Sequence, residues 1–237
     1  ADTDVILPFS TTIDYIPENK DYEIKNISMT LNAEVLAEIT EKIKSRLIVE
    51  LFKDEERITE ESTEITVLAF DEWHGYAYYP ELLTSFVTPN HPDLVKIIAR
   101  AAEFLKEWTG NPSMDAYQTQ DPNRVLNQAA AIFSAVKGEN IVYSVPPASF
   151  EKVGQRVRLC DAVIGQKFGT CLDLTLLYAS CLEAVGLHPI MILTKGHIFS
   201  GVWLEQLSFP EPVQDDPSVV TKRLAAGGNE IAVIETT

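Results

Sequence analysis

A cysteine and a histidine occupy positions in this sequence where a reactive pair is expected. Cys171 follows the turn Gly169-Thr170 and opens a long apolar run that predicts a helix, and His197 heads a strand-like segment further along. A helix N-terminus favours a negative charge, and so does a neighbouring imidazolium. The sequence therefore predicts a thiolate–imidazolium pair, with Cys171 as the nucleophile of a thiol enzyme.

Two further groups are needed around such a pair. The second ring nitrogen of a catalytic histidine is held by an acceptor, for which we favour Glu235 on the last predicted strand. Asp215 and Asp216, in a Pro-flanked segment, are the alternatives. An oxyanion needs N–H donors, which the helix start supplies. Gln166 is a candidate side-chain donor, or else it stabilises its own loop.

The remaining cysteines and histidines are interpreted as structural. Cys181 lies among leucines in a helical run, Cys160 fits a loop or core thiol, and His188 stands in a turn. Neither a CxxC nor an HxxxH spacing occurs, so we expect no metal site and no cofactor. Three cysteines do not suggest a disulfide framework and fit a reducing, cytoplasmic setting.

Periodicity divides the chain into two parts. Residues 1–75 contain alternating segments at 45–53 and 63–70, joined by a polar hairpin turn, and a short helix is predicted at 32–43. We interpret 1–75 as a small β-sandwich-like domain, truncated so that its first strands would precede this sequence. Residues 76–90 are predicted to be a linker.

Residues 91–237 are predicted to form an α+β domain. Apolar residues at helical spacing mark helices that end near Gly110 and Gly138, followed by a long loop at 146–166. The run at 170–185 is apolar on most faces, which indicates a buried central helix. Strands are predicted at 189–194, 197–205 and 230–236.

Composition narrows the classes of partner. The chain has 237 residues, 46% of them hydrophobic, and a formal net charge of −16. Such an acidic surface argues against direct binding to nucleic-acid phosphates. No apolar run approaches the roughly 18 residues of a membrane span, so no membrane association is expected.

Several segments resemble, in their order, the transglutaminase-like, papain-related superfamily of cysteine proteases. The resemblance covers roughly residues 90–237. It is carried by Asn123-Arg124-Val125, Ala129-Ala130-Ala131-Ile132-Phe133, Ile141-Val142-Tyr143-Ser144, Gly169-Thr170-Cys171-Leu172-Asp173-Leu174, Ala184-Val185-Gly186-Leu187-His188-Pro189, Gly196-His197 and Ile234-Glu235-Thr236. It implies the cysteine proteinase fold, Cys171 as nucleophile, His197 as general base and acid, and an acid on the following strand. The Asp-Pro-Thr usual in that family reads Glu235-Thr236 here.

The whole chain is also similar to the accessory N-terminal region of large bacterial helicase-related proteins. The segments that carry this likeness are Ala69-Phe70-Asp71-Glu72-Trp73, Phe86-Val87-Thr88-Pro89-Asn90-His91-Pro92, Asp121-Pro122-Asn123-Arg124, Val145-Pro146-Pro147-Ala148-Ser149-Phe150 and Pro210-Glu211-Pro212-Val213. It implies helicase-type domains in the same parent chain as partners. No phosphate-binding loop of the GxxxxGK[ST] type occurs here, so ATP chemistry is not assigned to this chain.

Two functions follow as hypotheses. The first is acyl transfer or hydrolysis on protein or peptide amides by Cys171, His197 and Glu235, as a cysteine peptidase or a transglutaminase-like enzyme. The second is an inactive scaffold that binds a protein partner through the same fold.

Overall fold

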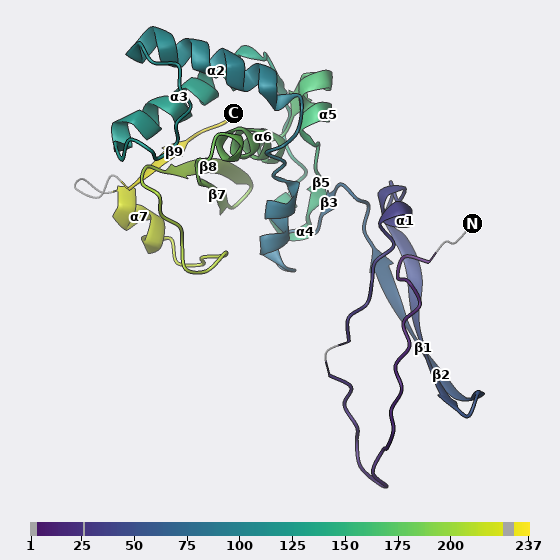
Figure 1. Ribbon diagram of the computed structural model, residues 1–237. Coiled ribbons are helices and arrows are strands. Elements are labelled where there is room, and N and C mark those ends of the chain that lie inside the picture. Colours follow the sequence, from purple (N-terminus) through teal and green to yellow (C-terminus); the bar gives the residue numbers. More distant parts are fainter. Residues whose placement is uncertain (1–3, 26, 225–229) are drawn as a thin grey trace. The chain divides into compact units, whose positions relative to one another are not determined.

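A computed structural model describes residues 4–25, 27–224 and 230–237. The chain forms two compact units, residues 1–71 and 72–237 (Figure 1). The boundary between the two units thus lies between residues 71 and 72, whereas the sequence predicted it at residue 75. Helices and strands occur together in the second unit, which is the predicted mixed α+β organisation. Among the described residues, no helix is both long and apolar enough to cross a membrane.

The first unit is built on one long antiparallel hairpin. Strands β1 (Ile43–Lys53) and β2 (Glu56–Val67) pair from Ile43↔Val67 to Lys53↔Glu56. Asp54 and Glu55 form the predicted turn, and both have positive φ, as a two-residue hairpin turn requires. The short helix α1 (Ala33–Ala37) starts at Asn32, whose side chain accepts from the N–H of Val35.

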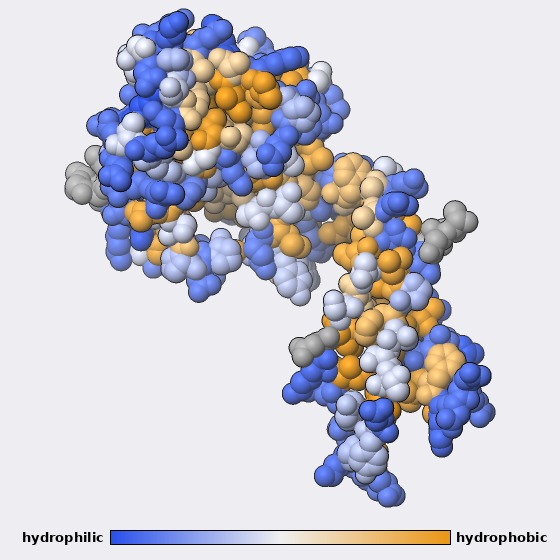
Figure 2. All heavy atoms as spheres, viewed as in Figure 1, coloured by the Kyte–Doolittle hydropathy of each residue, from blue (hydrophilic) through white to orange (hydrophobic). Residues whose placement is uncertain are grey.

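The predicted sandwich is not formed by the described residues of this unit. Beyond the hairpin they contain one isolated bridge, Ile6↔Leu31, and no second sheet. A sandwich needs a second sheet to pack on the first. Without one, apolar side chains of the hairpin stay exposed, for example Ile48 and Val49, and Figure 2 shows such residues along this unit.

The second unit is organised around one buried helix. Helix α6 (Cys171–Ala184) is buried from Cys171 to Leu182, as its apolar sequence predicted. It contacts α2 (Leu94–Thr109), α3 (Pro122–Gly138), α5 (Cys160–Gln166) and the sheet strands β7 (Pro189–Thr194) and β8 (His197–Trp203) (Figure 1). The helix is therefore enclosed between helices and a sheet.

The two long helices beside α6 end where their sequences predict. Gly110, with φ 77°, ends α2 in the left-handed region that glycine tolerates. Asp121 caps α3 by accepting from the N–H of Asn123, and Pro122 occupies the first turn. Their buried faces join α6 in the main hydrophobic core.

The sheet beneath α6 is antiparallel, in the order β7-β8-β9, where β9 is Ile231–Ile234. The tight turn at Lys195-Gly196 connects β7 to β8, so that Thr194 pairs with His197. The pairing of β8 with β9 runs from Trp203↔Ile231 to Ser200↔Ile234. The last residues of the chain therefore continue alongside the beginning of β8. Helix α7 (Ser218–Leu224) lies before β9 in the chain.

The predicted linker belongs to the second unit. It contains the 3-10 helix η1 (Pro80–Phe86), whose Leu83 is buried in a cluster with Cys171 and Ile198. The predicted long loop at 146–166 likewise contains α4 (Phe150–Val153), β5 (Gln155–Arg156) and all of α5. Both segments are irregular in sequence, but tertiary contacts order them.

Two very short strand pairs fasten these segments. Strand β3 (Glu72–Trp73) pairs with β5, and β4 (Val142–Tyr143) pairs in parallel with β6 (Phe168–Gly169). The first pair brings two backbones so close that a Cβ at Gly154, where φ is +79°, would lie 1.9 Å from the carbonyl oxygen of Trp73. Glycine is therefore required at this crossing.

Candidate active site

Cys171 is the first residue of α6, and the turn before it is held by a capping box. The Thr170 side chain accepts from the N–H of Asp173, and the Asp173 carboxylate accepts from the N–H of Thr170 at 2.9 Å. This reciprocal pair fixes the direction in which the chain enters the helix. It thereby fixes the backbone position from which the Cys171 side chain extends.

Asp173 is fully buried, and Arg158 completes its surroundings. The Arg158 backbone N–H donates to Asp173 Oδ1 at 2.8 Å, and its guanidinium donates to Oδ2 at 3.1 Å. Gln155 donates to Thr170 Oγ1 at 3.1 Å from the neighbouring strand β5. A buried carboxylate is tolerated when it is paired and hydrogen-bonded in this way. The start of α6 is therefore anchored to the segment at 155–158.

The Cys171 thiol is buried, and several donors surround its sulfur. Burial raises the pKa of the Cys171 thiol, while hydrogen bonds from the backbone N–H groups of Ile198 and Leu172 and from the Tyr143 hydroxyl oppose this effect. Burial is the larger influence, so the pKa lies above its ordinary value. The expected resting thiolate is therefore corrected: in this conformation Cys171 is a neutral thiol at neutral pH.

His197 and Glu235 meet at the edge of the sheet. His197 Nε2 lies 2.8 Å from Glu235 Oε2, which confirms the predicted contact between these side chains. The other carboxylate oxygen of Glu235 accepts from the N–H and the hydroxyl of Thr237. Burial alone would raise the pKa of Glu235, but the hydrogen bonds from His197 and Thr237 outweigh it and lower the pKa. Glu235 is thus held ionised.

Helix α6 is tied to the same two strands that carry this pair. Thr175, one turn after Cys171, donates from its hydroxyl to the Ile198 carbonyl at 3.3 Å. Its hydroxyl oxygen also lies 3.1 Å from the hydroxyl oxygen of Thr236. Ile198 directly follows His197, and Thr236 directly follows Glu235. The thiol and the imidazole–carboxylate pair therefore belong to one hydrogen-bonded junction of helix and sheet.

In the described part of the chain, the other candidate residues form no hydrogen bond with Cys171, His197 or Glu235. Gln166 is an exposed residue at the end of α5. Asp216 binds Ser218 at the start of α7, and Asp215 is likewise exposed. Of the acidic alternatives weighed for His197, the structure thus brings only Glu235 to it within the described part of the chain.

The residues interpreted as structural have partners that fit that interpretation. The imidazole Nδ1 of His188 lies 2.7 Å from the Leu207 carbonyl oxygen. Cys160 and Cys181 are buried free thiols in the main core. Among residues 4–25, 27–224 and 230–237, no group of three or more His, Cys, Asp or Glu side chains is placed to hold a metal ion.

Tyr143 is a site residue that the sequence reasoning missed. Burial raises the pKa of Tyr143, and the neighbouring Cys171 and Glu235 raise it further. The segment Ile141-Val142-Tyr143-Ser144 carried part of the family resemblance, but its spacing from Cys171 gave no sign of contact. Only the parallel pairing of β4 with β6 brings the two together.

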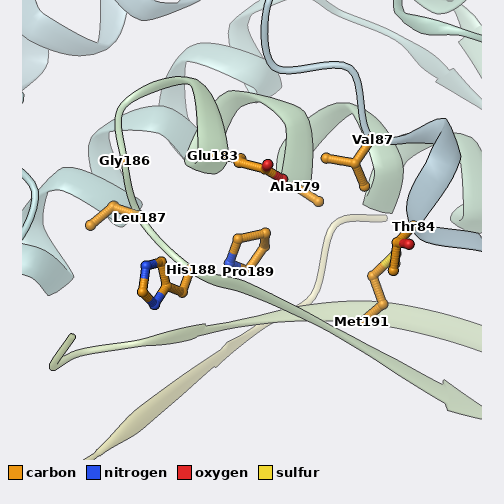
Figure 3. Close-up of a pocket in the computed structure, with 9 residues that line it drawn as sticks. All are labelled: Thr84, Val87, Ala179, Glu183, Gly186, Leu187, His188, Pro189 and Met191. Atoms are coloured by element: carbon orange, nitrogen blue, oxygen red, sulfur yellow. The ribbon is translucent and has the colours of Figure 1, made fainter. Parts of the chain in front are cut away.

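A cavity of about 450 Å³ lies at the opposite end of α6 (Figure 3). It is lined by Thr84, Val87, Ala179, Glu183, Gly186, Leu187, His188, Pro189 and Met191. At 1.5 Å per residue, Ala179 and Glu183 lie roughly 12–18 Å along the helix from Cys171. The cavity is therefore separate from the thiol.

Comparisons of the chain with models of protein families, with curated proteins and with solved structures found no significant match in any of the three.

Proposed function

We propose that the second unit is a transglutaminase-like domain that transfers acyl groups from protein or peptide amides through Cys171, His197 and Glu235. The observation that carries this proposal is the contact of 2.8 Å between His197 Nε2 and Glu235 Oε2. His197 directly precedes Ile198, whose N–H lowers the pKa of the Cys171 thiol. A nucleophile at a helix start, a base and an acidic partner are the groups that acyl transfer needs.

The neutral resting thiol determines the order of proton transfers. His197 accepts the thiol proton as the sulfur attacks the amide carbon, and the carbonyl π electrons move to the oxygen. Helix N–H groups bind this oxyanion. The intermediate collapses, the C–N bond breaks, and imidazolium His197 gives its proton to the leaving amine. Glu235, whose pKa is lowered, stabilises the imidazolium in between.

The thioester then reacts with water or with an amine. Water gives a carboxylate, which is the outcome of a peptidase or amidase, and an amine gives a new amide, which is the outcome of a cross-linking enzyme. In both cases His197 accepts a proton from the attacking group, and the Cys171 sulfur leaves from the acyl carbon and recovers a proton. The same three residues therefore serve both halves of the reaction.

The experiment is to incubate the protein with a library of peptide amides, with and without a primary amine, and to follow products by mass spectrometry. The proposal is supported if the wild-type protein forms product and carries an acyl adduct on Cys171, and if both are absent in Cys171→Ala and His197→Ala. Product formation that survives in Cys171→Ala would contradict it.

The complete burial of the Cys171 sulfur favours a second candidate function, a non-catalytic scaffold. In that case the helix–sheet junction serves stability, and the domain binds a protein partner, such as helicase-type domains of a parent chain. This function requires that Cys171 of the wild-type protein resists alkylation until the protein unfolds. It also requires that the protein forms no adduct with any peptide.

A further inference from the structure

Backbone pairing holds Tyr143 beside the turn that precedes Cys171. The N–H of Val142 donates to the Lys167 carbonyl and the N–H of Ser144 donates to the Gly169 carbonyl, each at 2.8 Å. Tyr143 is thereby in register with Gly169, two residues before Cys171. The short strand β4 thus positions the Tyr143 side chain at the start of α6.

Tyr143 lies near two acidic groups of the candidate site, Cys171 and Glu235. Burial raises the pKa of Tyr143, and the negative charge that develops on Cys171, a hydrogen bond to Cys171 and the charge of Glu235 raise it further. A phenol next to these negative charges keeps its proton at neutral pH. Tyr143 can therefore act as a hydrogen-bond donor at this site but not as a base.

We infer that the Tyr143 hydroxyl, and not the Gln166 amide, is the side-chain donor of this site. It hydrogen-bonds the Cys171 sulfur in the resting protein and turns to the carbonyl oxygen when the sulfur attacks. This inference rests on the proposed acyl transfer and adds a catalytic residue to it. Its first half, the stabilisation of the sulfur anion, is testable without any substrate.

The location of Tyr143 argues against a purely structural role for its hydroxyl. The side chain is 42% exposed, and it belongs to none of the three buried clusters of the described residues. Tyr143→Phe removes the donor and keeps the ring, so the fold should be unaffected. A change in the reactivity of Cys171 in this variant would then report on the donor itself.

The test is the rate of alkylation of Cys171 by iodoacetamide between pH 6 and pH 11, read by peptide mapping in the native protein. In Tyr143→Phe we expect the apparent pKa of alkylation to rise by about one unit, so that the rate at pH 8 falls about tenfold. Tyr79→Phe is the matched control, because Tyr79 is 69% exposed and lies outside the site; its profile should equal that of the wild type.

Replacement of Tyr143 by 3-fluorotyrosine covers the case in which Tyr143→Phe fails to fold. The fluorinated phenol keeps the side-chain shape and is a stronger donor, so the apparent pKa of Cys171 should fall instead. The inference would be overturned if the pH profile of Cys171 alkylation is unchanged in the folded Tyr143 variants. In that case a lower rate of alkylation in His197→Ala would still support the proposed function. A wild-type Cys171 that does not react at any pH would overturn both.

Discussion

Removal of the Asp173 carboxylate should unfold the start of α6, and the structure allows the size of the effect to be worked out. The carboxylate accepts from two backbone N–H groups, those of Thr170 and Arg158, from the Thr170 hydroxyl and from the Arg158 guanidinium. In Asp173→Ala all four donors lose this partner. The helix also loses its capping box.

The expected loss in the free energy of unfolding is about 3–4 kcal/mol. Each buried N–H left without an acceptor costs about 1–3 kcal/mol. The guanidinium adds less than a buried charge would, because the Arg158 side chain is 35% exposed and water can replace the carboxylate. The total lies near the lower end of the 3–5 kcal/mol typical of breaking a buried ion pair. Asp173→Asn keeps one acceptor oxygen and should lose about 2 kcal/mol.

Urea denaturation followed by tryptophan fluorescence measures this loss, because all three tryptophans, Trp73, Trp108 and Trp203, lie in the second unit. Glu183→Ala, on the same helix but exposed, is the control and should stay within about 0.5 kcal/mol of the wild type. A loss below about 1 kcal/mol in Asp173→Ala, with an unchanged denaturant slope, would refute the assignment of Asp173 as the anchor of this turn.

Three further predictions follow from burial, charge and backbone geometry. Burial raises the pKa of the Cys181 thiol, so the folded protein keeps this proton at a pH where the unfolded chain loses it. The contribution of Cys181 to stability is therefore complete below the ordinary thiol pKa of about 8.5 and is lost as pH rises. In Cys181→Ala, the alkaline fall in unfolding free energy should be less steep by about 1.4 kcal/mol per pH unit above pH 9. Glu235→Gln should slow alkylation of Cys171 about tenfold, because Glu235 acts on the thiol through His197. The slowing should be the same at pH 5.5 and pH 8, because the lowered pKa keeps Glu235 ionised at both. An effect at one pH only would contradict this prediction. Gly154→Ala should cost about 3 kcal/mol or more in urea denaturation. Gly138→Ala, at the end of α3 and with no neighbouring atom near the added Cβ, should be neutral or stabilising by up to about 1 kcal/mol.

Local patterns in the sequence predicted the parts of the site that local rules determine. The apolar run after Gly169-Thr170 marked the start of α6, and alternation around His197 marked a strand. Glu235 was chosen because it is an acidic residue on the last predicted strand, and the pairing of β8 with β9 explains why that strand lies beside His197. The catalytic roles of these residues stay predictions.

Tertiary packing decided what the sequence could not show. Tyr143 joins the site through a strand of two residues, which has no periodicity to read. The segment at 76–90 resembles a linker, yet Leu83 is buried against the same cluster as Cys171. The sandwich was inferred from real alternation at 45–53, but alternation predicts an apolar face and not the presence of a second sheet.

The same packing changes how the chemistry at Cys171 has to be understood. A helix start predicts a lowered thiol pKa, and the Leu172 N–H does act in that direction. However, the helix start is also enclosed by residues from distant segments, among them Trp73 and Phe150, and their desolvation of the sulfur is the larger effect. In the proposed mechanism, the nucleophile therefore forms during the attack, by transfer of the thiol proton to His197. The reactivity of Cys171 should therefore depend on His197 and Tyr143 together, and a double variant that lacks both should differ from the sum of the single changes.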